Sequence, residues 1–107
     1  MISKNEELPV IPGRQGVTER RPKHDPSVLS VEEWSYEPGV EFAGGHAHNE
    51  SQLTYIAKGK IRFSQEGEEV ILEAGSYYYT AAGTPHRILE IIEPTTMITF
   101  GTPVHAE

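Results

Sequence analysis

Two histidines, His46 and His48, stand two residues apart in a glycine-flanked run. In an extended segment, alternate side chains point to the same face, so we expect the two imidazoles to lie side by side. Gln52 follows at the head of an apolar run, and His86 comes after a Gly-Thr-Pro turn. Imidazole is the commonest protein ligand of transition metals, and an amide oxygen can complete the set. The four residues therefore predict a site for one divalent transition metal (Fe, Ni, Mn or Zn), with positions left open for a small-molecule ligand.

Simpler interpretations compete with this site. Three histidines near turns can be unrelated polar residues, although imidazoles that converge inside a barrel would then be buried donors without partners. Gln52 can also act as a hydrogen-bonding neighbour of a three-histidine site rather than as a ligand. As a ligand, glutamine would leave the metal with its full charge, which predicts weaker metal binding and stronger attraction for anions than glutamate would give.

The spacing of the first histidines resembles a motif of the cupin superfamily. That motif is His-x-His, three or four residues, Glu, six residues and Gly. His46, His48, Gln52 and Gly59 fit this spacing, with glutamine in place of glutamate. The resemblance implies that these histidines and Gln52 are metal ligands.

A second cupin motif is also matched. It is a glycine, five residues, Pro-x-Gly, two residues, His, three residues and Asn. Gly75, Gly83 and His86 fit it, with Ala81 in place of proline and Glu90 in place of asparagine. Two motifs in register imply a small, single-domain cupin with His86 as a further metal ligand.

The expected fold is all-β, a single cupin β-barrel (double-stranded β-helix or jelly roll) formed by residues 28–107. Short β-prone runs separated by glycine turns, without helical periodicity, are typical of such barrels. Breaks are expected at Lys58-Gly59 and at Pro94. The expected strands cover residues 28–36, 53–57, 60–65, 69–72, 77–80, 86–92 and 95–100.

Residues 1–27 are expected to form an N-terminal arm. They hold four prolines and two glycines, which allow only coil or short edge strands. A segment this poor in apolar residues is ordered only where something covers it, and its own barrel or a partner subunit are the candidates. Exchange of the arm between subunits would make a homodimer.

Composition excludes several classes of function. The net charge is −7 and there is no cysteine, which excludes disulfides, thiol catalysis and sulfur-ligated metals. No apolar run reaches the roughly 18 residues of a membrane span and no signal peptide is evident, so we expect a cytoplasmic protein. The acidic barrel argues against nucleic acid, and we interpret the basic run at residues 20–24 as a solvated or dimer-contacting segment.

The His-His-Gln-His set resembles the small cupins of pectin degradation, which linearise the unsaturated uronate left by pectin and alginate lyases. That family uses an acid and an aromatic residue near the C-terminal strand. Phe100 matches the aromatic, but Ile98 and Thr99 stand where the acid is expected, and no arginine follows Pro103. The resemblance implies the metal site and, as a candidate ligand, a sugar acid, while the acid–base residue stays open.

Glu90 is the acid–base candidate, because it shares strand parity with His86, which must point inward. One residue of strand irregularity would instead put Glu90 in solvent. Phe100, Tyr55 and Tyr79 are candidates for substrate binding, with barrel packing as the alternative for the tyrosines.

Three functions remain open at this stage. The first is a metal-dependent isomerase or lyase that acts on a small, anionic, oxygenated molecule, with the metal as Lewis acid. The second is a non-haem iron dioxygenase, which needs the same open coordination positions. The third is a non-catalytic module that binds a metal or a small ligand.

Overall fold

A computed structural model of the protein describes residues 1–42 and 49–102, and their secondary structure is almost entirely β. No helix in these two ranges is long and apolar enough to cross a membrane. The all-β class predicted from the sequence is confirmed. The elements are the 3-10 helix η1 (Asn5–Glu7) and the strands β1 (Ile11–Pro12), β2 (Val17–Arg20), β3 (Ser30–Tyr36), β4 (Gln52–Gln65), β5 (Glu68–Glu73), β6 (Tyr77–Thr80) and β7 (His86–Gly101).

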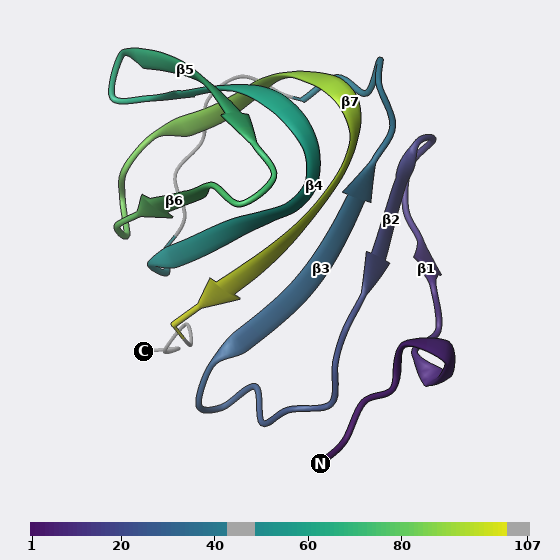
Figure 1. Ribbon diagram of the computed structural model, residues 1–107. Helices are drawn as coiled ribbons and strands as arrows, with labels where there is room; N and C mark the ends of the chain where they lie inside the picture. The colour runs from purple at the N-terminus through teal and green to yellow at the C-terminus, as the bar shows by residue number, and fades with distance from the viewer. Residues whose placement is uncertain (43–48, 103–107) are drawn as a thin grey trace.

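Two long, bent strands organise the sheet. Its order is β1-β2-β3-β7-β4-β5, with β6 also paired to β4, and every pairing is antiparallel. One half of β4 pairs with β6 and the other half with β5, while β7 follows β4 along nearly its whole length. Figure 1 shows how β4 and β7 curve together, so that the sheet curls into a jelly-roll barrel.

The expected breaks at Lys58-Gly59 and at Pro94 are wrong, because both positions lie inside continuous strands. The β4–β7 pairing shifts register on both sides of Lys58 and again after Lys60, as β-bulges do. Proline has no N–H to donate to a ladder and is tolerated at a bulge. Gly59 faces Pro94 here with φ of +97°. The sequence signals that predicted chain breaks therefore mark the bend of the barrel.

The barrel interior is apolar at its centre. Inward-facing residues of β4 and β7 alternate with outward-facing ones, and β3, β5 and β6 add partly buried side chains around them. Burial of this kind stabilises the fold by about 25 cal/mol per Å² of apolar surface. The buried cluster comprises Ile56, Ile61, Phe63, Ile91 and Met97.

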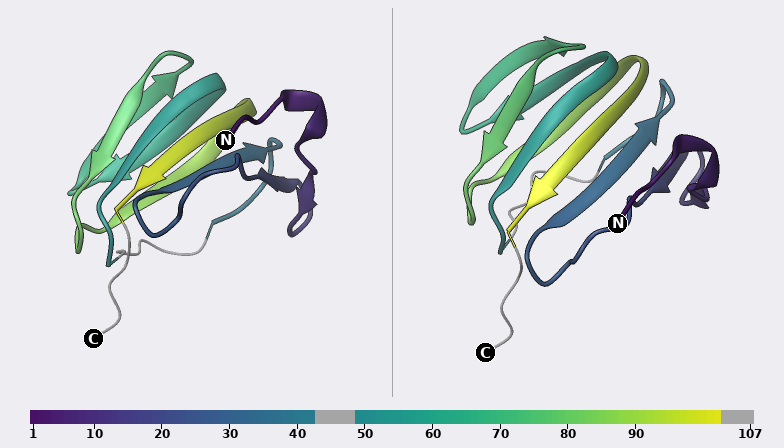
Figure 2. Two further views of the ribbon diagram at one scale, coloured as in Figure 1. Left: turned by 90° about the horizontal axis from the view of Figure 1, so that it is seen from below. Right: turned by 60° about the horizontal axis from the view of Figure 1, so that its bottom comes forward.

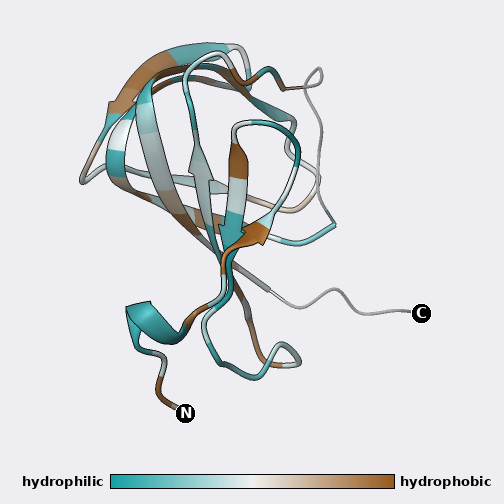
Figure 3. Cartoon of the chain, turned by 90° about the vertical axis from the view of Figure 1, so that its right-hand side faces the viewer, coloured by the Kyte–Doolittle hydropathy of each residue, from teal (hydrophilic) through white to brown (hydrophobic). Residues whose placement is uncertain are grey.

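The N-terminal segment extends one edge of the sheet. β1 and β2 form a hairpin whose second strand pairs with β3 of the same chain, and Figure 2 shows both strands at this edge. η1, which precedes the hairpin, is hydrophilic in Figure 3. The arm thus packs on its own barrel, and a homodimer with exchanged arms stays a prediction.

Candidate functional site

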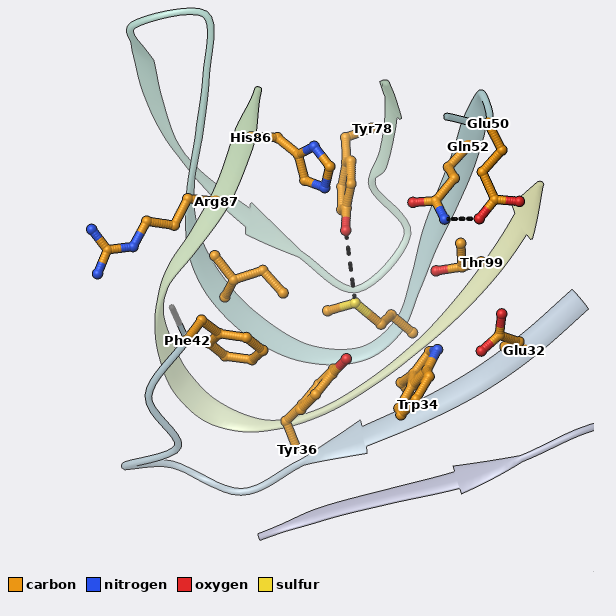
Figure 4. A pocket seen from close by; sticks show the side chains of 12 residues that line it. Glu32, Trp34, Tyr36, Phe42, Glu50, Gln52, Tyr78, His86, Arg87 and Thr99 are labelled. Carbon is orange, nitrogen blue, oxygen red and sulfur yellow. Dashed lines mark hydrogen bonds between the residues drawn. The ribbon is translucent and has the colours of Figure 1, made fainter. Parts of the chain in front are cut away.

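A pocket of about 290 Å³ opens into one end of the barrel. Figure 4 shows side chains from β3, β4, β6 and β7 converging on it. Its volume is at the lower end of the range for small-molecule sites, which run from about 300 Å³ upward. Aromatic residues form much of its wall, and Met97 of the buried cluster also lines it. The polar and charged residues that line it are Glu32, Glu50, Gln52, His86, Arg87 and Thr99.

Two of the four predicted metal ligands, Gln52 and His86, line this one pocket. They are the first residues of β4 and β7, so they come from different parts of the chain. His46 and His48 lie outside the described residues. Within residues 1–42 and 49–102, no three His, Asp or Glu side chains are grouped as a metal site would need. Among the described residues, the fit of a metal therefore depends on Gln52 and His86.

The amide of Gln52 is oriented by a neighbouring carboxylate. Its Nε2 donates a hydrogen bond of 2.8 Å to Oε1 of Glu50. A carboxylate can only accept, so the amide oxygen of Gln52 is the atom directed away from Glu50, into the pocket (Figure 4). An oxygen held this way by an outer partner suits a metal ligand.

His86 is buried, with 7% of its surface exposed. Its Nδ1 lies 3.2 Å from the carbonyl oxygen of Thr84, in the turn that precedes β7. Because a carbonyl only accepts, Nδ1 is the donor in this contact. Metal-binding histidines are usually held by such a bond from the other ring nitrogen. Both described residues therefore fit a metal site.

Glu90 lies outside the pocket, and the prediction that it faces inward is wrong. β7 pairs Ile88 with Phe63 and Glu90 with Arg62, with a register shift between the two pairs that reverses the parity after Ile88. Oε1 of Glu90 lies 3.5 Å from Nε of Arg62, and 55% of the Glu90 side chain is exposed. This register shift is a β-bulge, and it turns Glu90 outward.

The aromatic candidates lie on the outer face of the sheet. Tyr79 and Phe100 are both exposed and pair with Leu53 from its two sides. Tyr55 packs on Tyr77 with ring centroids 4.7 Å apart. These side chains have the opposite parity from Gln52 and Thr99, which line the pocket. None of the three candidates lines the pocket that holds His86.

Sequence reasoning missed two acids, Glu32 and Glu50, which both line the pocket. A signal was available for Glu32, since it shares strand parity with Trp34 and Tyr36, whose aromatic side chains mark the inner face of β3. For Glu50, which precedes β4, no strand periodicity could place the side chain.

Two tyrosine hydroxyl groups in the wall of the pocket are buried. Burial raises the pKa of the Tyr36 hydroxyl and of the Tyr78 hydroxyl well above the ordinary tyrosine value. The Tyr78 ring stacks on Phe63 with centroids 4.1 Å apart, and its hydroxyl points to the sulfur of Met97 at 4.0 Å. The charged residues that line the pocket therefore lie next to a region of low dielectric, where their interactions are stronger than in water.

Comparison with solved structures agrees with the fold. An RmlC-like cupin from Shewanella frigidimarina is similar with a TM-score of 0.84, at 19% sequence identity over 96% of this chain and 90% of that one. KdgF from Halomonas sp. is similar with a TM-score of 0.84, at 20% identity over 95% and 92% of the two chains. Pac13 from Streptomyces, described as a unique nucleoside dehydratase, is similar with a TM-score of 0.70, at 16% identity over 99% and 84%.

Likenesses at such identities show the fold and leave the activity open. A search of curated proteins finds no match to this sequence. The family model of the cupin domain, by contrast, matches residues 32–99, which is more than half of the chain. The protein therefore belongs to the cupin family.

Proposed function

We propose that this cupin binds one divalent metal through His46, His48, Gln52 and His86. The observation that carries the proposal is the convergence of Gln52 and His86 on one pocket, each oriented by an outer hydrogen bond. In its bound state, such a metal would supply Lewis-acid chemistry, polarising a carbonyl or enolate oxygen. The proposed activity is isomerisation, ring opening or elimination on a small, oxygenated, anionic molecule such as a sugar acid.

The charges around the proposed metal are the reason to propose an anionic substrate. All four proposed ligands are neutral, so a divalent metal would keep its full charge toward a substrate. Glu50 is engaged by the amide of Gln52, and Arg87 adds a cation at the rim, although its side chain points away from the cavity in Figure 4. Binding of an anion is then helped further when Glu32 carries a proton.

The remaining side chains bind, orient and exclude water. Trp34, Tyr36 and Phe42 form a wall on which the carbon skeleton of a substrate can pack. Thr99 faces the pocket beside them, and its hydroxyl shares a hydrogen bond of 3.0 Å with that of Thr54. A cavity of about 290 Å³ accommodates a molecule the size of one monosaccharide.

The first substrate to test is the unsaturated uronate released by pectin and alginate lyases. The likeness to KdgF and the His-His-Gln-His set support this choice. We expect zinc- or nickel-loaded protein to consume it without oxygen, and His86→Ala protein to leave it unchanged. Oxygen uptake that requires iron would instead identify a dioxygenase. Ligand binding without turnover under any metal would identify a binding module.

Exchanging the side chains at positions 50 and 52 tests whether Gln52 is a ligand. In the double variant Glu50→Gln/Gln52→Glu, the hydrogen bond between the two positions can form with its direction reversed. A carboxylate ligand cancels part of the metal charge, so we expect metal affinity to rise by about tenfold or more, with weaker binding of anions. Isothermal titration with zinc and then with a uronate measures both.

The single variants complete this experiment. Gln52→Glu alone places two carboxylates against each other and should gain less affinity than the double variant. Glu50→Gln alone keeps a neutral residue at position 52 and serves as the control. An unchanged zinc affinity in the double variant would mean that Gln52 is not a ligand.

A further inference from the structure

Glu32 carries a carboxyl group on the inner face of β3. It lines the pocket beside Trp34, and its pairing partner on β7 is Thr99, which also lines the pocket. Figure 4 shows Glu32 and His86 on opposite sides of the cavity. Burial and polar neighbours therefore act on a carboxyl group that can still contact a bound molecule.

A second carboxyl group, that of Glu19, lies behind Glu32. Glu19 of β2 pairs with Trp34, which places it diagonally across from Glu32 on the same face of the sheet. It is buried, with 6% of its surface exposed, and its charge acts on the carboxyl group of Glu32. Two carboxyl groups share a hydrogen bond only when one of them holds a proton.

Arg21 stabilises the negative charge of one member of the pair, Glu19. Its Nε donates to Oε2 of Glu19 at 2.5 Å and its Nη2 to Oε1 at 3.2 Å, a two-point clamp. This clamp lowers the pKa of Glu19. Burial, then the hydrogen bond and charge of Glu19, raise the pKa of Glu32, with Glu50 adding to the rise and Arg21 opposing it. When the pair holds a single proton, these opposite directions place that proton on Glu32.

We propose that Glu32 is the acid–base group of this pocket, and that Glu19, clamped by Arg21, is a positioning residue for its proton. The inference rests on the proposed function, because it needs a substrate that exchanges protons in the pocket. Its chemistry is that of a cyclic hemiacetal, such as the closed form of a uronic acid. Glu90, the acid expected from the sequence, points out of the barrel and is in no position to act.

Glu32 alone can give and take back the proton that ring opening requires. Protonated Glu32 gives its proton to the ring oxygen as the bond from that oxygen to the anomeric carbon breaks, and the electron pair of the bond stays on the oxygen. The anomeric hydroxyl oxygen becomes the carbonyl, and its proton passes to the carboxylate of Glu32. Glu32 ends protonated, as it began, and no co-reactant is consumed.

The location of the proton can be tested without substrate. In protein labelled with ¹³C at glutamate carboxyls, the Glu32 resonance is the one missing in Glu32→Gln. We expect it to titrate above the ordinary glutamate value, because burial and Glu19 raise its pKa. Glu33, the next residue of β3, lies on the outer side near Arg20 and is the control position. Glu19→Gln should move the Glu32 titration to lower pH, and Arg21→Gln should move it to higher pH. A Glu32 resonance that titrates at the ordinary glutamate value and ignores both substitutions would overturn the inference.

The catalytic role is tested with the unsaturated uronate and zinc-loaded protein. General acid–base catalysis contributes about 100-fold or more, so Glu32→Gln should lower kcat at least 100-fold with KM and zinc content little changed. Glu33→Gln is the matched control and should keep wild-type rates. Glu19→Gln should move the alkaline limb of the kcat/KM profile to lower pH, and Arg21→Gln should move it to higher pH. Full turnover by Glu32→Gln would refute the role.

The melting temperature of Glu32→Gln shows whether the carboxyl group of Glu32 also stabilises the fold. When the folded-state pKa of a carboxyl is raised, stability falls as pH rises through the window above its ordinary value, because the unfolded chain loses the proton first. Glu32→Gln should therefore melt at the same temperature as the wild type or higher at neutral pH. Absence of turnover by the wild type with any metal would overturn the proposed function and the catalytic role together, whereas the NMR titration would still report where the proton lies.

Discussion

Gly59→Ala is expected to lower the free energy of unfolding by roughly 2–4 kcal/mol, because a strained positive φ and overpacking act together. Gly59 has φ of +97°, a conformation that favours glycine. A Cβ there would lie 2.3 Å from the carbonyl oxygen of Pro94 and 2.6 Å from Cα of Thr95. Both atoms belong to the backbone of β7, which cannot move aside without disturbing the bend of the barrel. Urea unfolding of the variant and the wild type measures the difference.

Gly75→Ala is the matched control for this prediction. Its φ of +93° is nearly the same, but among the described residues, its two chain neighbours aside, no atom lies within 4 Å of the position that a Cβ would take. We expect a loss of only about 1 kcal/mol, from backbone strain alone. Equal losses in the two variants would show that the close approach of β4 to β7 is not what makes Gly59 necessary.

Removal of the metal is expected to lower the melting temperature by about 10 °C or more. A ligand present at a thousand times its dissociation constant stabilises the folded state by about 4 kcal/mol, and in a domain of this size each kcal/mol is worth several degrees. His86→Ala deletes a buried proposed ligand, so its melting temperature should no longer respond to a chelator. Differential scanning calorimetry with and without EDTA measures this response.

His24→Ala is the control for loss of a histidine outside the pocket. His24 lies in the N-terminal segment, where Nδ1 contacts the carbonyl oxygen of Pro22 and Nε2 accepts from the amide of Val31. This variant is expected to melt at a lower temperature and still to respond to the chelator. A wild-type melting temperature that ignores the chelator would count against a metal that contributes to folding.

The positions of the strands could be predicted from the sequence because local periodicity reports them. Runs such as 69–72 and 77–80 alternate or are β-prone, and strands lie there. The continuity of β4 and β7 could not be predicted in this way. Gly59 and Pro94, taken alone, each predict the end of a strand. They mark a bend instead because they face each other across the paired strands β4 and β7.

Motif spacing was enough to predict part of the candidate site. Gln52 and His86 do line one pocket. Parity counted along β7 from His86 failed at Glu90, since a bulge is a tertiary feature with no local signature there. The pair of Glu19 and Glu32 depends on the pairing of β2 with β3 and could be seen only in the folded chain.

The most direct test of the central claim is elemental analysis of the protein purified without a histidine tag, beside its His46→Ala and His86→Ala variants. We expect about one equivalent of Fe, Ni, Mn or Zn per chain, lost in both variants. No metal in the wild type, and none taken up on titration with these ions, would contradict it. The pocket would then belong to a cupin that binds its ligand without a metal.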